Sequence, residues 1–265
     1  MKKFNSIIIE GLRSCVTAWK NEALIEAFLF SDDSTGKHIY ESFLNLHQQK
    51  DDAQAESDFI RNSFRIEPEL FNALADSKQP QGIIFIIEKP NLYKLSDWLA
   101  KKQKKIEKNQ SENKQPLKLA LLDQLKDPGN LGTIIRTANA FDFPALILYR
   151  GTVDPYNPKV MRSMMGSLFA LDLIELDSYQ GLADLAKQYK LEILVSDLDG
   201  LDLPSYRSSP HKAGFVLAIG NEAHGVDFAL KKVADQILTI PMPGNAESLN
   251  AATAFAILAY QLNQA

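Results

Sequence analysis

The second half of the chain alternates apolar runs with helical patterns, and this alternation limits the possible folds more than any other feature. The apolar runs have the length and the valine, leucine and isoleucine content of buried strands: 117–122, 145–149, 171–176, 191–196, 213–219 and 236–240. Helical patterns separate or follow them at about 130–141, 158–168, 179–190, 226–233 and 248–262. Continuous apolar strands alternating with helices predict an α/β domain whose Rossmann-like parallel sheet is covered on both faces.

A lysine-rich polar segment separates this domain from a weaker α/β pattern nearer the N-terminus. Residues 101–116 (KKQKKIEKNQSENKQP) contain almost no apolar side chains and end in Pro116, which predicts an interdomain linker. Before it, 64–75 has the pattern of a strand followed by a helix, and 81–87 that of a strand. We therefore predict a smaller α/β domain over 1–100, a basic linker over 101–116 and the larger domain over 117–265.

The charge balance restricts how this chain could bind a nucleic acid. Its 29 basic and 33 acidic residues give a net charge of −4. A nucleic-acid surface would therefore have to be a local patch rather than a global field. Residues 101–116 carry six lysines and two glutamates, a net charge of +4, and a solvated linker would have the same composition.

Cysteine, histidine and hydropathy narrow the class further. The single cysteine, Cys15, excludes an intramolecular disulfide and is typical of a cytoplasmic protein. The longest apolar runs are too short to span a bilayer, so we expect no membrane partner. We also expect no metal site, because the four histidines lack ligand spacing: His38, His47, His211 and His224.

The first of three polar turns, DPGNLGTIIRTANAFDF, follows the strand at 117–122. Gly132 lies where a helix is expected to begin, and the backbone amides and dipole of a helix start favour an anion such as a phosphate. Arg136 is a permanent cation on an otherwise apolar stretch of that helix. A helix cap followed by a surface arginine would explain the same residues.

The second turn, LAIGNEAHGVD at 217–227, follows the strand at 213–219. Gly220 and Gly225 bracket a loop in which the backbone comes close to another group or adopts a positive φ. It is not a phosphate-binding loop of the G-x-x-x-x-G-K type, because Val226 follows the second glycine. An ordinary strand–helix turn would explain the glycines but not Glu222.

The third turn begins IPMPGNAESLN and leads into an alanine-rich helix at the C-terminus. Its prolines and glycine make a rigid loop, after which Glu247, Ser248 and Asn250 cluster at the start of the helix. Serine or asparagine at that place is usually a helix cap. The small alanine side chains of this helix allow close packing, for example against a second subunit.

Together the three turns resemble the ordered motifs of the SpoU/TrmH family in the SPOUT superfamily of RNA methyltransferases. The segment 157–171 is also similar to the family, through Asn157, Arg162 and Gly166, and more loosely so are 7–19 and 81–87. The resemblance covers nearly the whole chain and is specific over 117–265. The residues that match the three motifs are Asn130, Gly132 and Arg136; Gly220, Asn221, Glu222 and Gly225; and Ile240, Pro241, Met242, Ser248, Leu249 and Asn250.

This resemblance implies a fold and an activity. The larger domain would be a SPOUT domain with a trefoil-knotted C-terminus that forms a homodimer, and 1–100 would be an L30e-like domain that binds the RNA substrate. The activity implied is transfer of a methyl group from S-adenosyl-L-methionine to a ribose 2′-hydroxyl of structured RNA. We expect ribosomal RNA, because of the added N-terminal domain. The alternatives are a transfer-RNA ribose methyltransferase and a non-catalytic RNA-binding protein of the same fold.

The resemblance also implies residue roles. Arg136 would be the catalytic residue, and we expect it to stabilise the developing alkoxide, because a guanidinium with a pKa above about 12 is a poor base. Asn130, Glu222, Ser248 and Asn250 would position Arg136 and the ribose. The residues expected to bind the cofactor are Leu217, Gly220, Asn221, Gly225, Ile240, Met242 and Leu249.

The absence of glycine-rich nucleotide-binding motifs from the sequence disfavours two other classes of enzyme. A dinucleotide-binding dehydrogenase requires G-x-G-x-x-G after an early strand, and the sequence contains none. The glycine-rich cofactor turn of Rossmann-type methyltransferases is missing as well.

Overall fold

The computed structural model describes residues 5–49, 53–109, 116–164, 166–208 and 211–264. The chain forms two compact units, one comprising Met1–Pro90 and Met165–Phe169 and the other Asn91–Met164 and Ala170–Ala265.

The first unit is a four-stranded mixed sheet with helices. The strand order is β1-β4-β2-β3, with β4 antiparallel to β1 and β2, and β2 parallel to β3. Aromatic side chains dominate its core, where the Phe28 ring lies 5.4 Å from that of Phe43 and 5.2 Å from that of Phe85. The elements are β1 (Ser6–Glu10), α1 (Leu12–Lys20), β2 (Ile25–Ser31), α2 (Ser34–Gln48), α3 (Ala53–Arg61), β3 (Ser63–Ile66), α4 (Pro68–Leu74) and β4 (Ile83–Glu88).

The second unit contains the predicted parallel sheet. Its strand order is β11-β9-β10-β6-β7-β8-β5, and every pair is parallel. The predicted fold class, an α/β domain with a parallel sheet, is confirmed. The strands are β5 (Tyr93–Lys94), β6 (Leu117–Leu122), β7 (Ala145–Tyr149), β8 (Asp172–Leu176), β9 (Leu191–Asp202), β10 (Gly214–Ile219) and β11 (Gln236–Thr239).

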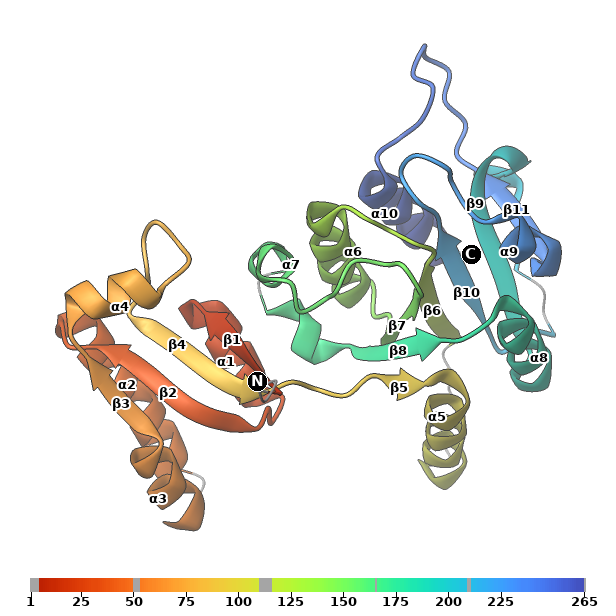
Figure 1. The fold of residues 1–265 in the computed structure, drawn as a ribbon. Coiled ribbons are helices and arrows are strands. Elements are labelled where there is room, and N and C mark those ends of the chain that lie inside the picture. The colour runs from red at the N-terminus through yellow and green to blue at the C-terminus, as the bar shows by residue number, and fades with distance from the viewer. Residues whose placement is uncertain (1–4, 50–52, 110–115, 165, 209–210, 265) are drawn as a thin grey trace. The chain divides into compact units, whose positions relative to one another are not determined.

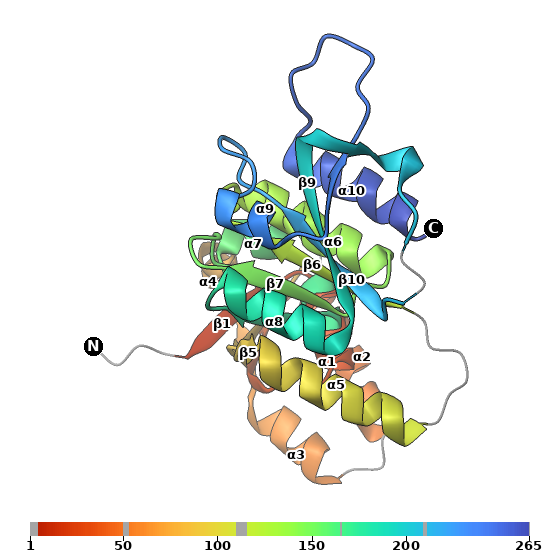
Figure 2. The ribbon, with the colours of Figure 1, turned by 90° about the vertical axis from the view of Figure 1, so that its right-hand side faces the viewer.

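Helices cover this sheet in two groups. On one side α5, α8 and α9 pack on a buried cluster that includes Leu119, Ile147, Ile193 and Val216, and α5 lies alongside α8 (Figures 1 and 2). In the other group α6 packs against α7 and α10. The helices are α5 (Leu95–Asn109), α6 (Pro128–Ala140), α7 (Pro158–Ser163), α8 (Tyr179–Tyr189), α9 (Phe228–Val233) and α10 (Ala251–Leu262), with short 3₁₀ turns at Ser167–Ala170 and Leu203–Ser205.

The predicted linker is partly wrong. Residues 101–109 continue α5, and 110–115 lie outside the described residues. Leu95, Trp98 and Leu99 are 4%, 3% and 2% exposed at helical spacing, so this segment starts as a buried helix, and lysine, a good helix former, extends it. Because β5 also joins the larger sheet, the boundary between the units falls after Pro90 rather than after residue 100.

Candidate functional site

A cavity of about 580 Å³ opens at the carboxyl ends of β9 and β10. The connection from β11 to α10, which contains the third sequence motif, projects from the unit beside α10 and forms one wall of this cavity (Figure 1). A parallel sheet binds ligands at this edge, and the volume is that of a small-molecule site. The wall comprises residues 196–198, 219–225, Lys231, Thr239, Ile240, Met242, 247–251 and Ala254.

Gly220 allows the second motif to fold back on itself. The amide of Asn221 donates to the Gly225 carbonyl and the Gly225 amide donates to the Asn221 carbonyl, both at 2.9 Å. A Cβ at position 220 would collide with the backbone of Gly225 and Val226. Of the two reasons expected for a glycine here, close approach applies to Gly220, and the close neighbour is the chain's own backbone. Gly225 does have a positive φ, 67°.

Asn221 holds this turn in place with its side chain. Its amide nitrogen donates to the Gln124 carbonyl at 2.9 Å, and its amide oxygen accepts from the Ala223 amide at 2.9 Å. The turn after β10 is thereby tied to the chain that leaves β6.

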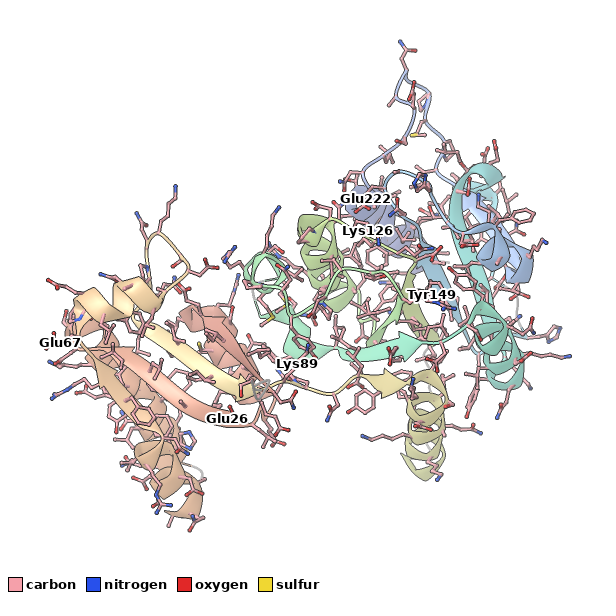
Figure 3. All side chains as sticks on the ribbon, viewed as in Figure 1. Glu26, Glu67, Lys89, Lys126, Tyr149 and Glu222 are labelled. Atoms are coloured by element: carbon pink, nitrogen blue, oxygen red, sulfur yellow. The ribbon has the colours of Figure 1, made fainter. Side chains whose placement is uncertain are left out.

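Glu222 binds the start of the first motif. Its carboxylate accepts from the backbone amides of Lys126 at 3.2 Å and Asp127 at 3.1 Å, and from the side-chain amide of Asn130 at 2.9 Å. Figure 3 shows Glu222 and Lys126 close together at this end of the sheet. Partial burial raises the pKa of Glu222, but these hydrogen bonds outweigh it and hold the pKa below its usual range. The carboxylate is therefore ionised and already occupied, a poor position for a general base.

Asn130 and Asn250 extend this network to the third motif. Asn130 is 8% exposed, and its side-chain oxygen accepts from the Asn250 side chain at 2.8 Å. The Asn250 oxygen in turn accepts from the amide of Ala252 at 2.9 Å and caps α10. Asn250 therefore caps α10, as its residue type predicts, and also links the third motif to the first.

The start of α6 does not match the expected anion site. Asp127 caps this helix, and its carboxylate accepts from the Asn130 amide at 2.8 Å. A phosphate cannot bind that amide while the Asp127 carboxylate occupies it. Gly132 also has a different reason to be glycine, because a Cβ there would collide with Ser163, where α6 packs against α7.

Two predicted site residues do not reach the cavity. Arg136 lies on α6 with an exposed side chain, and within the described residues its guanidinium makes no hydrogen bond or ion pair. Leu217 is 0% exposed inside β10 and does not line the cavity. The other predicted residues either line it or, like Asn130, contact a residue that does: Gly220, Asn221, Glu222, Gly225, Ile240, Met242, Ser248, Leu249 and Asn250.

Sequence reasoning missed two carboxylates near this cavity. Asp197 lines it and forms an ion pair with Lys231 of α9. Asp123 is 1% exposed and accepts from the Tyr179 hydroxyl at 2.6 Å and from the Asp227 amide at 2.7 Å. Burial and the bond to Asp123 raise the pKa of Tyr179. Asp123 follows the strand at 117–122 directly, and that position could have identified it.

Two features are absent from the part of the chain that the structure describes. Among those residues no group of three or more histidine, cysteine, aspartate or glutamate side chains could hold a metal ion. No helix in the same residues is long and apolar enough to cross a membrane.

Comparison with known proteins places this geometry in a family. Residues 118–260 match the model of the SpoU rRNA Methylase family. The chain is 31% identical over 262 residues to the 23S rRNA (guanosine(2553)-2′-O)-methyltransferase RlmP of Bacillus subtilis, covering 98% of this chain and 89% of that protein.

Solved structures share the fold over nearly the whole chain. An AdoMet-bound rRNA methyltransferase from Sinorhizobium meliloti is 24% identical with a TM-score of 0.75, covering 98% of this chain and 87% of that one. The SpoU methyltransferase AviRb from Streptomyces viridochromogenes is 22% identical with a TM-score of 0.74, covering 98% and 90%. On the family model and the relative from Bacillus subtilis, this chain belongs to the SpoU rRNA methylase family.

Proposed function

We propose that this protein transfers a methyl group from S-adenosylmethionine to a ribose 2′-hydroxyl of structured RNA, namely ribosomal RNA. The observation that carries the proposal is the chain of hydrogen bonds from Asn250 through Asn130 to Glu222, which joins all three family motifs beside a single cavity. The Bacillus subtilis relative, an rRNA ribose methyltransferase by name, supports the same reaction and substrate class.

The residues of the cavity fit S-adenosylmethionine. Backbone at Gly220 can offer polar groups to the cofactor, and Ile240, Met242 and Leu249 provide apolar contacts for an adenine ring. When bound, the cofactor supplies an electrophilic methyl group on a sulfonium. The role expected for Leu217 becomes indirect, because this side chain is part of the core beneath the site.

The protein's own groups would position the ribose and stabilise the charge that develops on its oxygen. Glu222 holds the first motif in place and is not available to accept the hydroxyl proton. Asn130, Asn250 and Ser248 would orient the ribose at the rim of the cavity. Arg136 is exposed and unpaired among the described residues, so an RNA strand that extends beyond the cavity can reach it. Since Arg136 does not line this chain's own cavity, its proposed role of stabilising the alkoxide and binding the neighbouring phosphate belongs to the RNA-bound homodimer.

The proposal includes a homodimer through the second unit. Helix α10 leaves Ile257 39% and Tyr260 56% exposed although most of its other apolar side chains are buried, which is the pattern of a helix with a further packing partner. The trefoil knot at the C-terminus, an RNA-binding role for the L30e-like first unit and action in the cytoplasm complete the proposal.

This function can be tested by methylation in vitro of RNA extracted from a strain that lacks the gene. Purified protein would be incubated with labelled S-adenosylmethionine and total RNA from that strain, and the RNA digested to nucleosides for mass spectrometry. We expect one 2′-O-methylated nucleoside to appear, and to map to ribosomal RNA. Methylation on a base, or on transfer RNA alone, would contradict the proposal.

A further inference from the structure

Helix α5 carries lysines that are not neutralised by any described neighbour. Lys101 and Lys104 are exposed, and their spacing of three residues places them on the same side of the helix. Within the described residues neither side chain forms a hydrogen bond or an ion pair. Lys101 instead lies above the ring of Tyr93, 5.5 Å from its centroid, and Tyr93 is itself 36% exposed.

The opposite side of this helix is anchored to the sheet. Leu95, Trp98 and Leu99 are buried, and the Trp98 indole donates to the Asp172 carboxylate at 2.7 Å. The lysines are therefore presented from a fixed element, not from a loose linker. A fixed element loses less conformational entropy when a ligand binds it.

Acidic side chains also lie near the start of this helix: Asp97 on α5 itself, and Glu175 and Asp177, which pair with Lys94. Lys94, at the end of β5, binds Asp177 at 3.1 Å and Glu175 at 3.4 Å. The pKa of Lys94 is raised, mainly by its hydrogen bond to Asp177. The negative charge of Asp177 and the hydrogen bond to Glu175 add to this effect. Among the described residues none of these three carboxylates forms an ion pair with Lys101 or Lys104, so both ammonium groups remain available to a ligand.

We propose that Lys101, Lys104 and Tyr93, which together we call the α5 face, bind the phosphate backbone of the RNA substrate. This inference rests on the proposed function. A protein with a net charge of −4 needs a local basic surface to hold RNA, and α5 provides one. The exposed Tyr93 ring adds a surface on which an unpaired base can stack.

The α5 face is remote from the chemistry. It lies at the β5 edge of the sheet, whereas the cavity lies at the β9 and β10 end of the strand order, and the match to the family model begins only at residue 118. The α5 face should therefore affect RNA affinity without affecting the reaction step or cofactor binding.

The test is the salt dependence of RNA binding by the full-length protein. Each phosphate contact adds roughly 0.7 to 0.9 to the slope of log affinity against log salt, so Lys101→Gln with Lys104→Gln should reduce the slope by about 1.4 to 1.8. The matched control is Lys187→Gln with Lys190→Gln, which removes two exposed lysines at the end of α8 in the same unit. We expect the control to keep the wild-type slope.

Activity measurements separate this inference from the proposed function. The α5 variant should have a higher KM for RNA, an unchanged kcat and unchanged cofactor affinity by calorimetry. An unchanged slope in a variant that still methylates RNA would overturn the role of the α5 face alone, as would an equal loss in the α8 control. If the wild type methylates no RNA, the proposed function fails first.

Discussion

At position 220 a side chain has no room, and the reason lies within the protein. The backbone of Gly225 and Val226 occupies the space that a Cβ would need. The sequence identified Gly220 as important because it follows a strand, but it could not show what lies against it. For Glu222 the sequence showed only that a turn does not require a carboxylate at this position. The structure supplies the reason, because the carboxylate accepts three hydrogen bonds from the first motif.

Replacing Gly220 with alanine should destabilise the protein and weaken cofactor binding together. Overpacking against backbone costs about 1–3 kcal/mol, and the displaced turn forms part of the cavity wall. Chemical denaturation and cofactor calorimetry would measure the two effects. Gly244→Ala is the control, because nothing lies within 4 Å of a Cβ at that position. A Gly220→Ala protein as stable as the Gly244→Ala protein would show that the turn has room to adjust.

Glu222 should make part of the stability depend on pH. Its pKa in the folded protein lies below the ordinary value of 4.5, so its contribution is present at higher pH and is lost as the pH falls through the folded-state value. Wild type should therefore lose more stability below about pH 4.5 than Glu222→Gln does, each relative to its own stability at pH 7. Denaturation curves between pH 7 and pH 3 would show this difference. Parallel pH profiles for the two proteins would exclude the carboxylate as the source.

At the scale of elements, the sequence predicted the larger sheet well because its strands are buried on both faces. Such strands are continuous apolar runs, and six of the seven were identified from them. β5 was missed because two residues, Tyr93 and Lys94, carry no pattern. The helix over 101–109 was missed because this segment is rich in lysine and has almost no apolar residues. The apolar side chains that anchor the helix, Leu95, Trp98 and Leu99, precede it. The contacts between motifs were not predictable, since 92 residues separate Asn130 from Glu222 and 120 separate it from Asn250.

Asn250 allows its two roles at the start of α10 to be tested apart. Asn250→Asp keeps the oxygen that caps the helix but loses the amide that donates to Asn130, whereas Asn250→Ala loses both. We expect Asn250→Ala to cost about 1 kcal/mol more stability than Asn250→Asp, and both to lose methyl transfer. The comparison uses thermal unfolding and methyl-transfer rates. Full activity in Asn250→Asp would show that capping alone is required.

At the scale of the whole molecule, the cavity proposed for the chemistry and the face proposed to bind RNA occupy different places. The cavity and the motif network lie at the carboxyl ends of β9 and β10, and the α5 face lies at the β5 edge of the same sheet. Arg136 lies outside the cavity wall, so we expect its guanidinium to contact the RNA and not the cofactor. The effect of Arg136 on methyl transfer and on cofactor affinity can be measured separately.

The decisive measurement is methyl transfer by wild type and Arg136→Ala, paired with cofactor calorimetry on both. RNA from a strain lacking the gene would be the substrate, and labelled methyl on ribose the product counted. We predict that wild type methylates ribose and that Arg136→Ala is slower by about 10²–10³ with cofactor affinity unchanged, because the variant lacks the group proposed to stabilise the alkoxide. Wild type that leaves every ribose unmethylated, or an Arg136→Ala protein as fast as wild type, would contradict the account.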